Sequence, residues 1–156
     1  MKIYLPDGGA FVRCAAAFGF GGTEDPVGVL LREAKRIAVV GLSSDVRRPS
    51  YEVASYLKGV GFTIIPVNPN ETEVLGEKAY ARLEDVPGPI DIVDVFRRAE
   101  FLPGIAEAAV AVKAKVLWMQ LGILNVEAAE RARAGGLVVV EDACLFVEDR
   151  KRRRGF

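Results

Sequence analysis

The chain has 156 residues, of which 51% are hydrophobic, and this length and composition are typical of one globular domain. Its 21 basic and 21 acidic residues balance, which argues against nucleic-acid binding as the main function. Histidine is absent, which excludes Ser-His-Asp catalysis, phosphohistidine chemistry and histidine-ligated zinc. The two cysteines, Cys14 and Cys144, are too few for a disulfide framework or a four-cysteine metal site. We therefore expect no metal and a reducing, cytoplasmic location.

The two ends of the chain differ from its middle. Residues 1–27 precede the first regular pattern, and we predict a loosely ordered N-terminal extension there. Its apolar stretch is interrupted by Arg13, a poor match to a signal peptide, and no apolar run reaches the roughly 18 residues of a membrane span. Residues 151–156 are predicted to form a basic tail. The five consecutive basic residues Arg150 to Arg154 are typical of a solvated terminus, the alternative being a contact with nucleic acid or another acidic partner.

Between these ends, helical and strand-like patterns alternate along residues 28–150. Hydrophobic spacing predicts helices over 27–36, 51–60, 103–112 and 126–134, and continuous apolar runs predict strands over 37–40, 62–67, 90–96, 116–119 and 137–140. Uninterrupted apolar strands indicate a parallel sheet buried on both faces. The prediction is an α/β fold, a doubly wound Rossmann-like sheet of five parallel strands in three α/β/α layers, with strand order 3-2-1-4-5. Ligands of such folds bind at the carboxyl ends of the strands.

The loop after the first strand has the composition of an anion site. Gly41 permits close backbone approach, Ser43 and Ser44 offer hydroxyls, and the next helix begins near Ser50 with Arg48 just before it. The alternative is an ordinary strand-to-helix turn. Neither a G-x-G-x-x-G motif nor a P-loop is present. The second strand ends at Asn68, where an NAD-binding fold carries an acidic residue, which disfavours a nicotinamide dehydrogenase.

Further polar residues follow the later strands. Arg97 suits a phosphate and Phe96 a base or a pantetheine arm, although a core phenylalanine and a solvated arginine would look the same. Gln120 ends the fourth strand, either lining the same crevice or capping the next helix. Asp91 and Asp94 are three residues apart on one strand, so they point to opposite faces and cannot form an acid–base pair; we expect each to orient a neighbouring loop.

Cys144 follows the fifth strand and allows two interpretations. As a nucleophile it would need an activator other than histidine, which the chain lacks. As a small, packed apolar residue it would have no chemical role, and free cysteines are often of this kind.

Several motifs, in order and at compact spacing, together resemble one protein family. They are Ile37 to Gly41, Arg48 to Tyr51, Pro66 to Pro69, Val74 to Gly76, Asp91 to Arg98, Trp118 to Gly122 and Cys144 to Glu148. The chain resembles the small CoA-binding-domain proteins, which are single-domain relatives of the nucleotide-binding domain of succinyl-CoA synthetase. The resemblance covers about residues 29–150 and implies a Rossmann-like sheet of five strands. It departs from the family at Ala143 and Asp149, where the family usually has arginine and histidine.

The resemblance implies coenzyme A as ligand and assigns roles to residues that match its motifs. The loop residues Gly41, Leu42, Ser43 and Ser44, with Arg48, would contact the CoA phosphates. Asn68 and Pro69 would line the adenosine side, Phe96 and Arg97 would flank the pyrophosphate or pantetheine, and Gln120 would line the same crevice. The expected function is CoA or acyl-CoA binding as a non-catalytic or regulatory module, without membrane association and with allowance for a homodimer. The alternative is an enzyme acting on a CoA thioester or a related nucleotide through Cys144 or a carboxylate.

Overall fold

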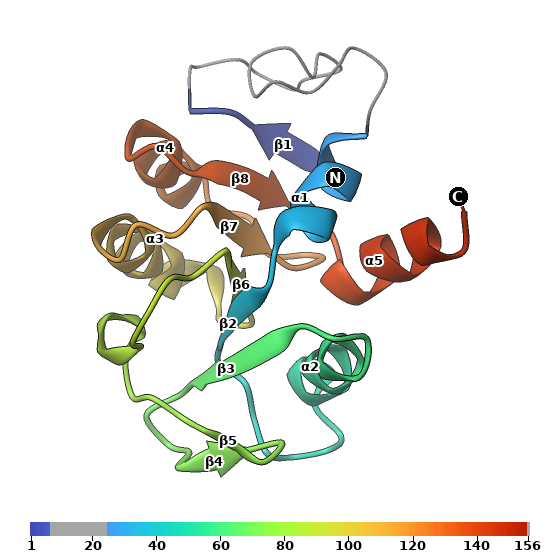
Figure 1. The fold of residues 1–156 in the computed structure, drawn as a ribbon. Helices are drawn as coiled ribbons and strands as arrows, with labels where there is room; N and C mark the ends of the chain where they lie inside the picture. The colour runs from blue at the N-terminus through green and yellow to red at the C-terminus, as the bar shows by residue number, and fades with distance from the viewer. Residues whose placement is uncertain (7–24, 156) are drawn as a thin grey trace.

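The computed structural model describes residues 1–6 and 25–155 (Figure 1). Five predicted strands and four predicted helices are confirmed to within two residues at most ends, and two of them, β7 and α4, both begin and end at the predicted residues. In chain order the elements are β1 (Lys2–Tyr4), α1 (Pro26–Glu33), β2 (Arg36–Val40), α2 (Pro49–Gly59), β3 (Thr63–Val67), β4 (Glu73–Val74), β5 (Glu77–Lys78), η2 (Leu83–Asp85), β6 (Ile92–Val95), η3 (Ala99–Phe101), α3 (Leu102–Ala111), β7 (Val116–Met119), α4 (Val126–Ala134), β8 (Val138–Glu141) and α5 (Leu145–Arg153).

The main sheet is mostly parallel, as predicted, but its strand order differs from the prediction. The observed order is β1-β8-β7-β6-β2-β3, and β2 pairs in parallel with both β3 and β6. Numbered as the five predicted strands, this is 2-1-3-4-5, so the order 3-2-1-4-5 is wrong. The reason lies in Pro66 of β3, which has no N–H to donate and therefore suits an edge strand. The predicted order would have placed that strand inside the sheet.

Helices cover both faces of the sheet and produce the three predicted layers. One core cluster joins α1, α2 and α5 to the face that carries Ile37, Val39 and Trp118. The other joins α3, α4 and η2 to the face that carries Val93 and Met119. Figure 1 shows α3 and α4 on one side of the strands and α2 and α5 on the other. The alternation of strand side chains between two buried faces explains why the strands are continuously apolar.

The N-terminal residues contribute to the sheet, which corrects the prediction for residues 1–27. Lys2–Tyr4 pairs antiparallel with β8 and makes a sixth strand, so the five-strand count is also corrected. Ile3 and Leu5 are buried, and the Tyr4 hydroxyl donates to Glu141 over 3.2 Å. Three residues are too few to show an alternating period, which is why no strand was predicted. Residues 7–24 of the expected extension lie outside the described residues.

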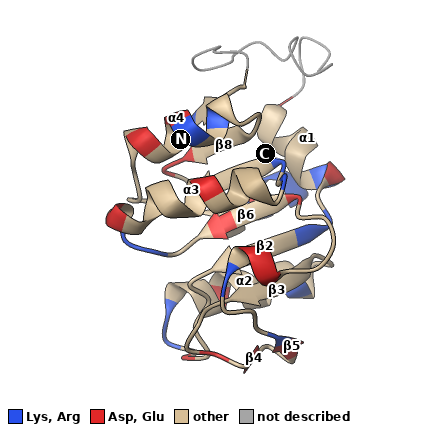
Figure 2. Ribbon diagram, turned by 90° about the vertical axis from the view of Figure 1, so that its left-hand side faces the viewer, with Lys and Arg blue, Asp and Glu red and all other residues tan. Residues whose placement is uncertain are grey.

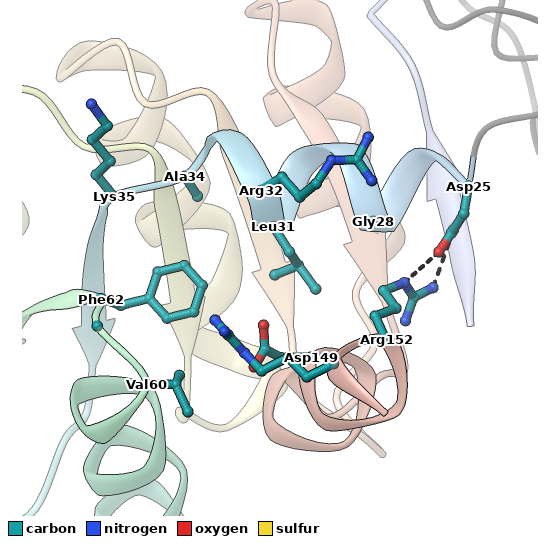
Figure 3. Close-up of a pocket in the computed structure, with 12 residues that line it drawn as sticks. Asp25, Gly28, Leu31, Arg32, Ala34, Lys35, Val60, Phe62, Asp149 and Arg152 are labelled. Atoms are coloured by element: carbon teal, nitrogen blue, oxygen red, sulfur yellow. Dashed lines mark hydrogen bonds and ion pairs between the residues drawn. The ribbon is translucent and has the colours of Figure 1, made fainter. Parts of the chain in front are cut away.

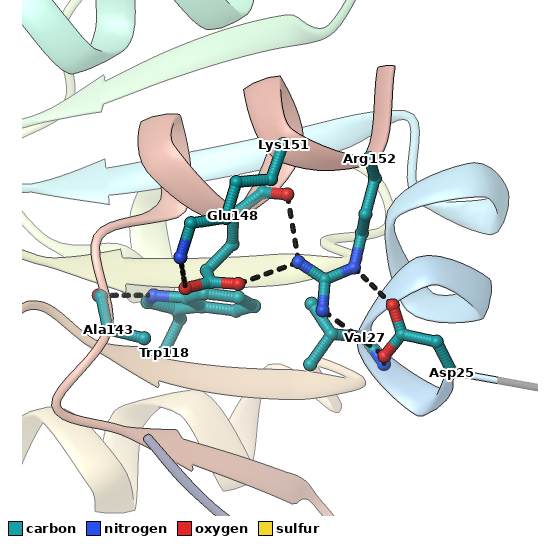
Figure 4. Close-up of polar contacts among 7 residues, drawn as sticks. All are labelled: Asp25, Val27, Trp118, Ala143, Glu148, Lys151 and Arg152. Atoms are coloured by element: carbon teal, nitrogen blue, oxygen red, sulfur yellow. Dashed lines mark hydrogen bonds and ion pairs between the residues drawn. The ribbon is translucent and has the colours of Figure 1, made fainter. Parts of the chain in front are cut away.

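The predicted basic tail, residues 151–156, begins inside helix α5. Arg152 donates to the carboxylate of Glu148 over 2.6 Å and also to both carboxylate oxygens of Asp25, the N-cap of α1 (Figure 4). Arg153 donates through Nε to Asp149 over 2.6 Å. Basic side chains in the last turn of a helix are favoured by the helix dipole, so this segment is a helix end that connects α5 to α1.

Candidate functional site

The carboxyl ends of β2, β3 and β6 meet around Gly41. Its φ of +87° is a left-handed conformation that favours glycine, and a Cβ atom added there would lie 2.5 Å from the carbonyl oxygen of Phe96. The Gly41 amide donates to the Val67 carbonyl over 2.8 Å, which holds the turn against the end of β3. β3 and β6 flank β2 on opposite sides, so this is the switch point of the sheet, where ligands of such folds bind.

A polar pocket lies on one side of Gly41, with a cavity volume of about 440 Å³. The loops after β2 and β3 and the end of β6 line it. Its residues are Gly41, Ser43, Arg48, Pro49, Ser50, Asn68, Asn70, Glu71, Phe96 and Arg97. The predicted residues Gly41, Ser43, Arg48, Asn68, Phe96 and Arg97 are therefore brought together from three separate loops.

An apolar pocket of about 290 Å³ lies on the other side of Gly41. It includes the predicted Pro69 and shares Gly41 and Arg97 with the polar pocket. The remaining residues come from β2, β3, the segment around η2 and the first turns of α3: Val40, Val67, Ala81, Arg82, Leu83, Glu84, Phe101, Gly104, Ile105 and Ala108. This wall was not predicted, because most of its residues lie between the strands and do not directly follow one. The spacing of Phe101, Ile105 and Ala108 along one helix face is the signal that would have found it.

Neither arginine of the polar pocket forms an ion pair with a carboxylate of the described residues, although Arg48 adds to the hydrogen bond from Arg47 in lowering the pKa of the Asp45 carboxyl. The guanidinium of Arg97 lies over the Phe101 ring, 4.4 Å from its centroid. Arg48 precedes α2 and likewise makes no described ion pair. Arg47 differs, because Asp45 holds it over 3.0 Å and its side chain is 86% exposed. Unpaired cations beside a backbone turn are the feature expected of a phosphate site.

The loop donors around the serines are already engaged. The Ser43 amide donates to Ser50 Oγ over 3.2 Å, and the Ser43 hydroxyl accepts from the Asp45 amide over 3.0 Å. Ser44 donates through both its amide and its hydroxyl to Glu71. The two donors that were expected to contact a CoA phosphate therefore bind a carboxylate of the same chain. The Leu42 side chain is fully buried, so this predicted residue can meet a ligand only through its backbone.

Gln120 lies in the core instead of lining either pocket, which corrects its predicted role. It is 4% exposed, and its Nε2 donates to Asp94 Oδ1 over 2.6 Å. Asp94 is fully buried, and burial raises the pKa of its carboxyl to about 7, against the opposing effect of the Gln120 hydrogen bond. The other oxygen, Oδ2, has no partner among the described residues. Asp94 thus orients Gln120 at the start of the loop after β7.

Asp91 directly precedes β6, the strand that contains Asp94, and has a separate structural role. Its carboxylate accepts from the amides of Lys35 and Arg36 over 2.8 and 2.9 Å, and it pairs with Lys115 over 3.2 Å. The prediction that the two aspartates orient neighbouring segments and form no acid–base pair agrees with these contacts.

Cys144 is half-buried at the N-cap position of α5 and packs against the core. The adjacent Ala143 carbonyl accepts from the indole of the buried Trp118 over 2.9 Å, which fixes the chain at this point. In residues 1–6 and 25–155, no three histidine, cysteine or acidic side chains are grouped as metal ligands would be. The helices within these ranges are too short or too polar to cross a bilayer.

A larger hollow, about 690 Å³, lies near the amino ends of the strands between α1, the end of α2 and α5. We call it the amino-end hollow. Figure 3 shows Leu31 and Phe62 directed into it and Arg152 held by Asp25 at its edge. Arg153 pairs with Asp149 on the same surface. Figure 2 shows basic and acidic segments interspersed along the ribbon. Because Arg152 and Arg153 are paired in place and none of the predicted site residues lies there, the crevice around Gly41 is the stronger candidate site.

A doubly wound sheet with a crevice lined by Arg48 and Arg97 at its switch point is the arrangement of Rossmann-like folds. Residues 35–150 match the family model described as a CoA binding domain. The chain belongs to this CoA-binding domain family, and its relation to the CoA-binding part of ADP-forming acetyl-CoA synthetases is shown by relatives of that kind.

The similar proteins are of two sizes. The uncharacterized protein YneT of Bacillus subtilis (strain 168) is 47% identical over 118 residues, covering 76% of this chain and 87% of that protein. A solved structure of a hypothetical protein from Pyrococcus horikoshii OT3 has a TM-score of 0.79 at 35% identity, covering 80% of this chain and 88% of that one. The acetate–CoA ligase (ADP-forming) II subunit alpha of Pyrococcus furiosus is 39% identical over 67 residues, which cover 42% of this chain and only 15% of that protein.

Proposed function

We propose that the protein binds coenzyme A or an acyl-CoA in the crevice around Gly41, as a non-catalytic or regulatory module. The observation that carries the proposal is the pair of pockets that meet at Gly41 and Arg97, one polar with unpaired arginines and one apolar. CoA has matching parts: phosphates, which require cations and backbone donors, and an adenine ring, which requires apolar walls. The family description and the relation to an acetate–CoA ligase support the same ligand.

The two pockets suggest how CoA divides between them. The apolar pocket has the size and the walls for a planar base, with Pro69, Leu83 and Ile105 around it. Arg97 borders both pockets, so its guanidinium can reach a pyrophosphate that crosses Gly41. The polar pocket, with Arg48, would receive the remaining phosphate or the start of the pantetheine arm.

The residues at the end of β3 favour CoA over NAD. Asn68 uses its amide within the protein: Nδ2 donates to the Leu42 carbonyl over 3.0 Å, and Oδ1 accepts from the Asn70 amide over 2.9 Å. It therefore does not replace the strand-end carboxylate that holds the NAD ribose in other Rossmann-like folds. Titration calorimetry with CoA and NAD tests the assignment. We expect CoA to bind and NAD to give no measurable heat, and equal affinities would refute it.

The non-catalytic part of the proposal rests on the surroundings of the candidate groups. Asp94 is fully buried, and Cys144 lines neither pocket. Glu71 does line the polar pocket, but its carboxylate is held by the Ser44 amide and hydroxyl. A general base must come within hydrogen-bond reach of the proton that it removes. We expect no hydrolysis of acetyl-CoA by the wild-type protein. Turnover that disappears in Cys144→Ala would instead support the enzyme alternative.

A further inference from the structure

Glu71 binds the donors of Ser44, a residue that the family resemblance assigns to the CoA phosphates and that lies in the loop after Gly41, at the edge of the polar pocket. A single oxygen, Oε1, accepts from the Ser44 amide over 3.0 Å and from the Ser44 hydroxyl over 2.9 Å. An amide and a hydroxyl converging on one anionic oxygen are the arrangement that proteins use for a phosphate oxygen. The carboxylate therefore occupies the place of a ligand anion.

The backbone presents Glu71 to this position. Asn68 Oδ1 accepts from the Asn70 amide over 2.9 Å, and the Asn68 carbonyl accepts from the Glu71 amide over 3.3 Å, so residues 68–71 form a compact turn. Asn68 Nδ2 also donates to the Leu42 carbonyl over 3.0 Å, which ties this turn to the loop that carries Ser44. Glu71 is half-buried as a result.

Glu71 also contributes a negative charge to the lining of the polar pocket. Its lining contains three ionisable residues, Arg48, Arg97 and Glu71. No lysine or arginine within the described ranges forms an ion pair with Glu71, and within these ranges its side chain accepts hydrogen bonds from Ser44. A phosphate entering this pocket gains from both arginines but meets the repulsion of the carboxylate, unless that carboxylate moves away.

We propose that Glu71 is an internal competitor for the phosphate of the ligand, and that it thereby sets the affinity of the crevice. This inference rests on the proposed function. Binding requires that a phosphate oxygen replace Glu71 Oε1 at the Ser44 amide and hydroxyl, with the Glu71 side chain turning toward solvent. An anion that binds Ser44 less strongly than the Glu71 carboxylate does cannot displace it. The Glu71–Ser44 contact therefore selects ligands that carry a strongly charged phosphate.

Titration calorimetry of Glu71→Gln against CoA tests the inference, with Glu73→Gln as the matched control. Glu73 lies two residues away in β4, is exposed and lines neither pocket, so its substitution removes the same charge without altering the contact to Ser44. We expect CoA to bind about tenfold more tightly to Glu71→Gln than to the wild type, and within about twofold of wild type to Glu73→Gln. Unchanged or weaker binding to Glu71→Gln would overturn the inference, the weaker case indicating that Glu71 holds a hydroxyl of the ligand.

Two further measurements separate this inference from the proposed function. Ser44→Ala should weaken CoA binding more in the Glu71→Gln background than in the wild type, because in the wild type the same substitution also removes a hydrogen bond that holds the competing Glu71 carboxylate. Inorganic pyrophosphate provides a probe that lacks the rest of CoA. Tighter pyrophosphate binding to Glu71→Gln with no CoA binding to either protein would support the Glu71 role and refute the CoA assignment. Equal pyrophosphate affinity of the two proteins would overturn the Glu71 role.

Discussion

The two ends of the parallel strands differ in how their charged side chains are used. At the carboxyl ends, Arg48 and Arg97 line a pocket together with Glu71, and neither arginine forms an ion pair in the described part of the chain. At the amino-end hollow, Arg152 is paired with Asp25 and Glu148, and Arg153 with Asp149. The same residue type thus serves an open crevice at one end and a closed set of ion pairs at the other.

This difference separates residues that would bind a ligand from residues that stabilise the fold. A paired cation has already formed its hydrogen bonds in the free protein, whereas an unpaired one gains them when an anion arrives. The Arg152 cluster connects the N-cap of α1 to the last turns of α5, two segments far apart in the sequence (Figure 4). Because Arg152 and Arg153 are already paired, the amino-end hollow gains less from these residues when an anion binds than the smaller pocket gains from Arg48 and Arg97.

The largest expected effect comes from filling the backbone turn between the two pockets. Gly41→Leu should abolish measurable CoA binding, because its Cβ would meet the Phe96 carbonyl and its side chain would fill the ligand position. Gly136→Leu is the matched control: its φ of +94° is similarly strained, and a Cβ there meets no atom within 4 Å. Each variant should lose roughly 1–2 kcal/mol of stability from the left-handed backbone alone. Calorimetry and thermal melts test this, and normal CoA binding by Gly41→Leu would contradict the assignment.

The next effect concerns Asp94, the buried carboxyl that orients Gln120. Its pKa is about 7 in the folded protein and about 3.8 when unfolded, so between these values the folded state holds a proton that the unfolded state releases. Stability from this group is therefore full below about pH 4 and falls by about 1.4 kcal/mol for each pH unit until about pH 7. Asp94→Asn should remove that slope, so urea titrations at several pH values should show a flatter profile. An unaltered profile would show that Asp94 is charged throughout.

A smaller effect is expected from the arginine shared by the two pockets. Arg97→Ala should weaken CoA binding by about tenfold to a hundredfold through the loss of charge-assisted hydrogen bonds. Its melting temperature should stay close to that of the wild type, because Arg97 makes no described ion pair. Arg98→Ala provides the control, since this neighbour is exposed and lines neither pocket. Equal affinities of the Arg97→Ala and Arg98→Ala variants would remove Arg97 from the site.

Much of the fold was predictable because its signals are local and long enough. Uninterrupted apolar strands, helical spacing and glycine stops place the central strands and helices within a few residues. The three-residue β1 and the strand order depend on pairing between distant segments, which no local pattern records. Pro66 indicated only that its strand lies at an edge of the sheet, which disfavours the order 3-2-1-4-5.

The crevice was predictable in part for the same reason. Residues that directly follow strands, such as Gly41, Asn68 and Arg97, converge because parallel strands end at the same edge. The wall formed by Leu83 and Ile105 comes from segments between the strands, and its position depends on how α3 packs. Gln120 has a strand-end position too, but its hydrogen bond to the buried Asp94 turns it into the core. That bond could not be foreseen, since the two residues are 26 apart in sequence.

The smallest expected effect tests the amino-end half of the comparison. Arg152→Ala should reduce the free energy of unfolding by about 1 kcal/mol, because its side chain is only 20% exposed and its loss leaves Asp25 and Glu148 without their shared partner. Lys151→Ala is the control, since Lys151 pairs with Glu148 over a longer 3.6 Å and is 57% exposed. CoA affinity should stay within about twofold of wild type in both variants. If Arg152→Ala instead left stability unchanged and weakened CoA binding, the amino-end hollow would be part of the binding site, and the division between the two ends of the sheet would be wrong.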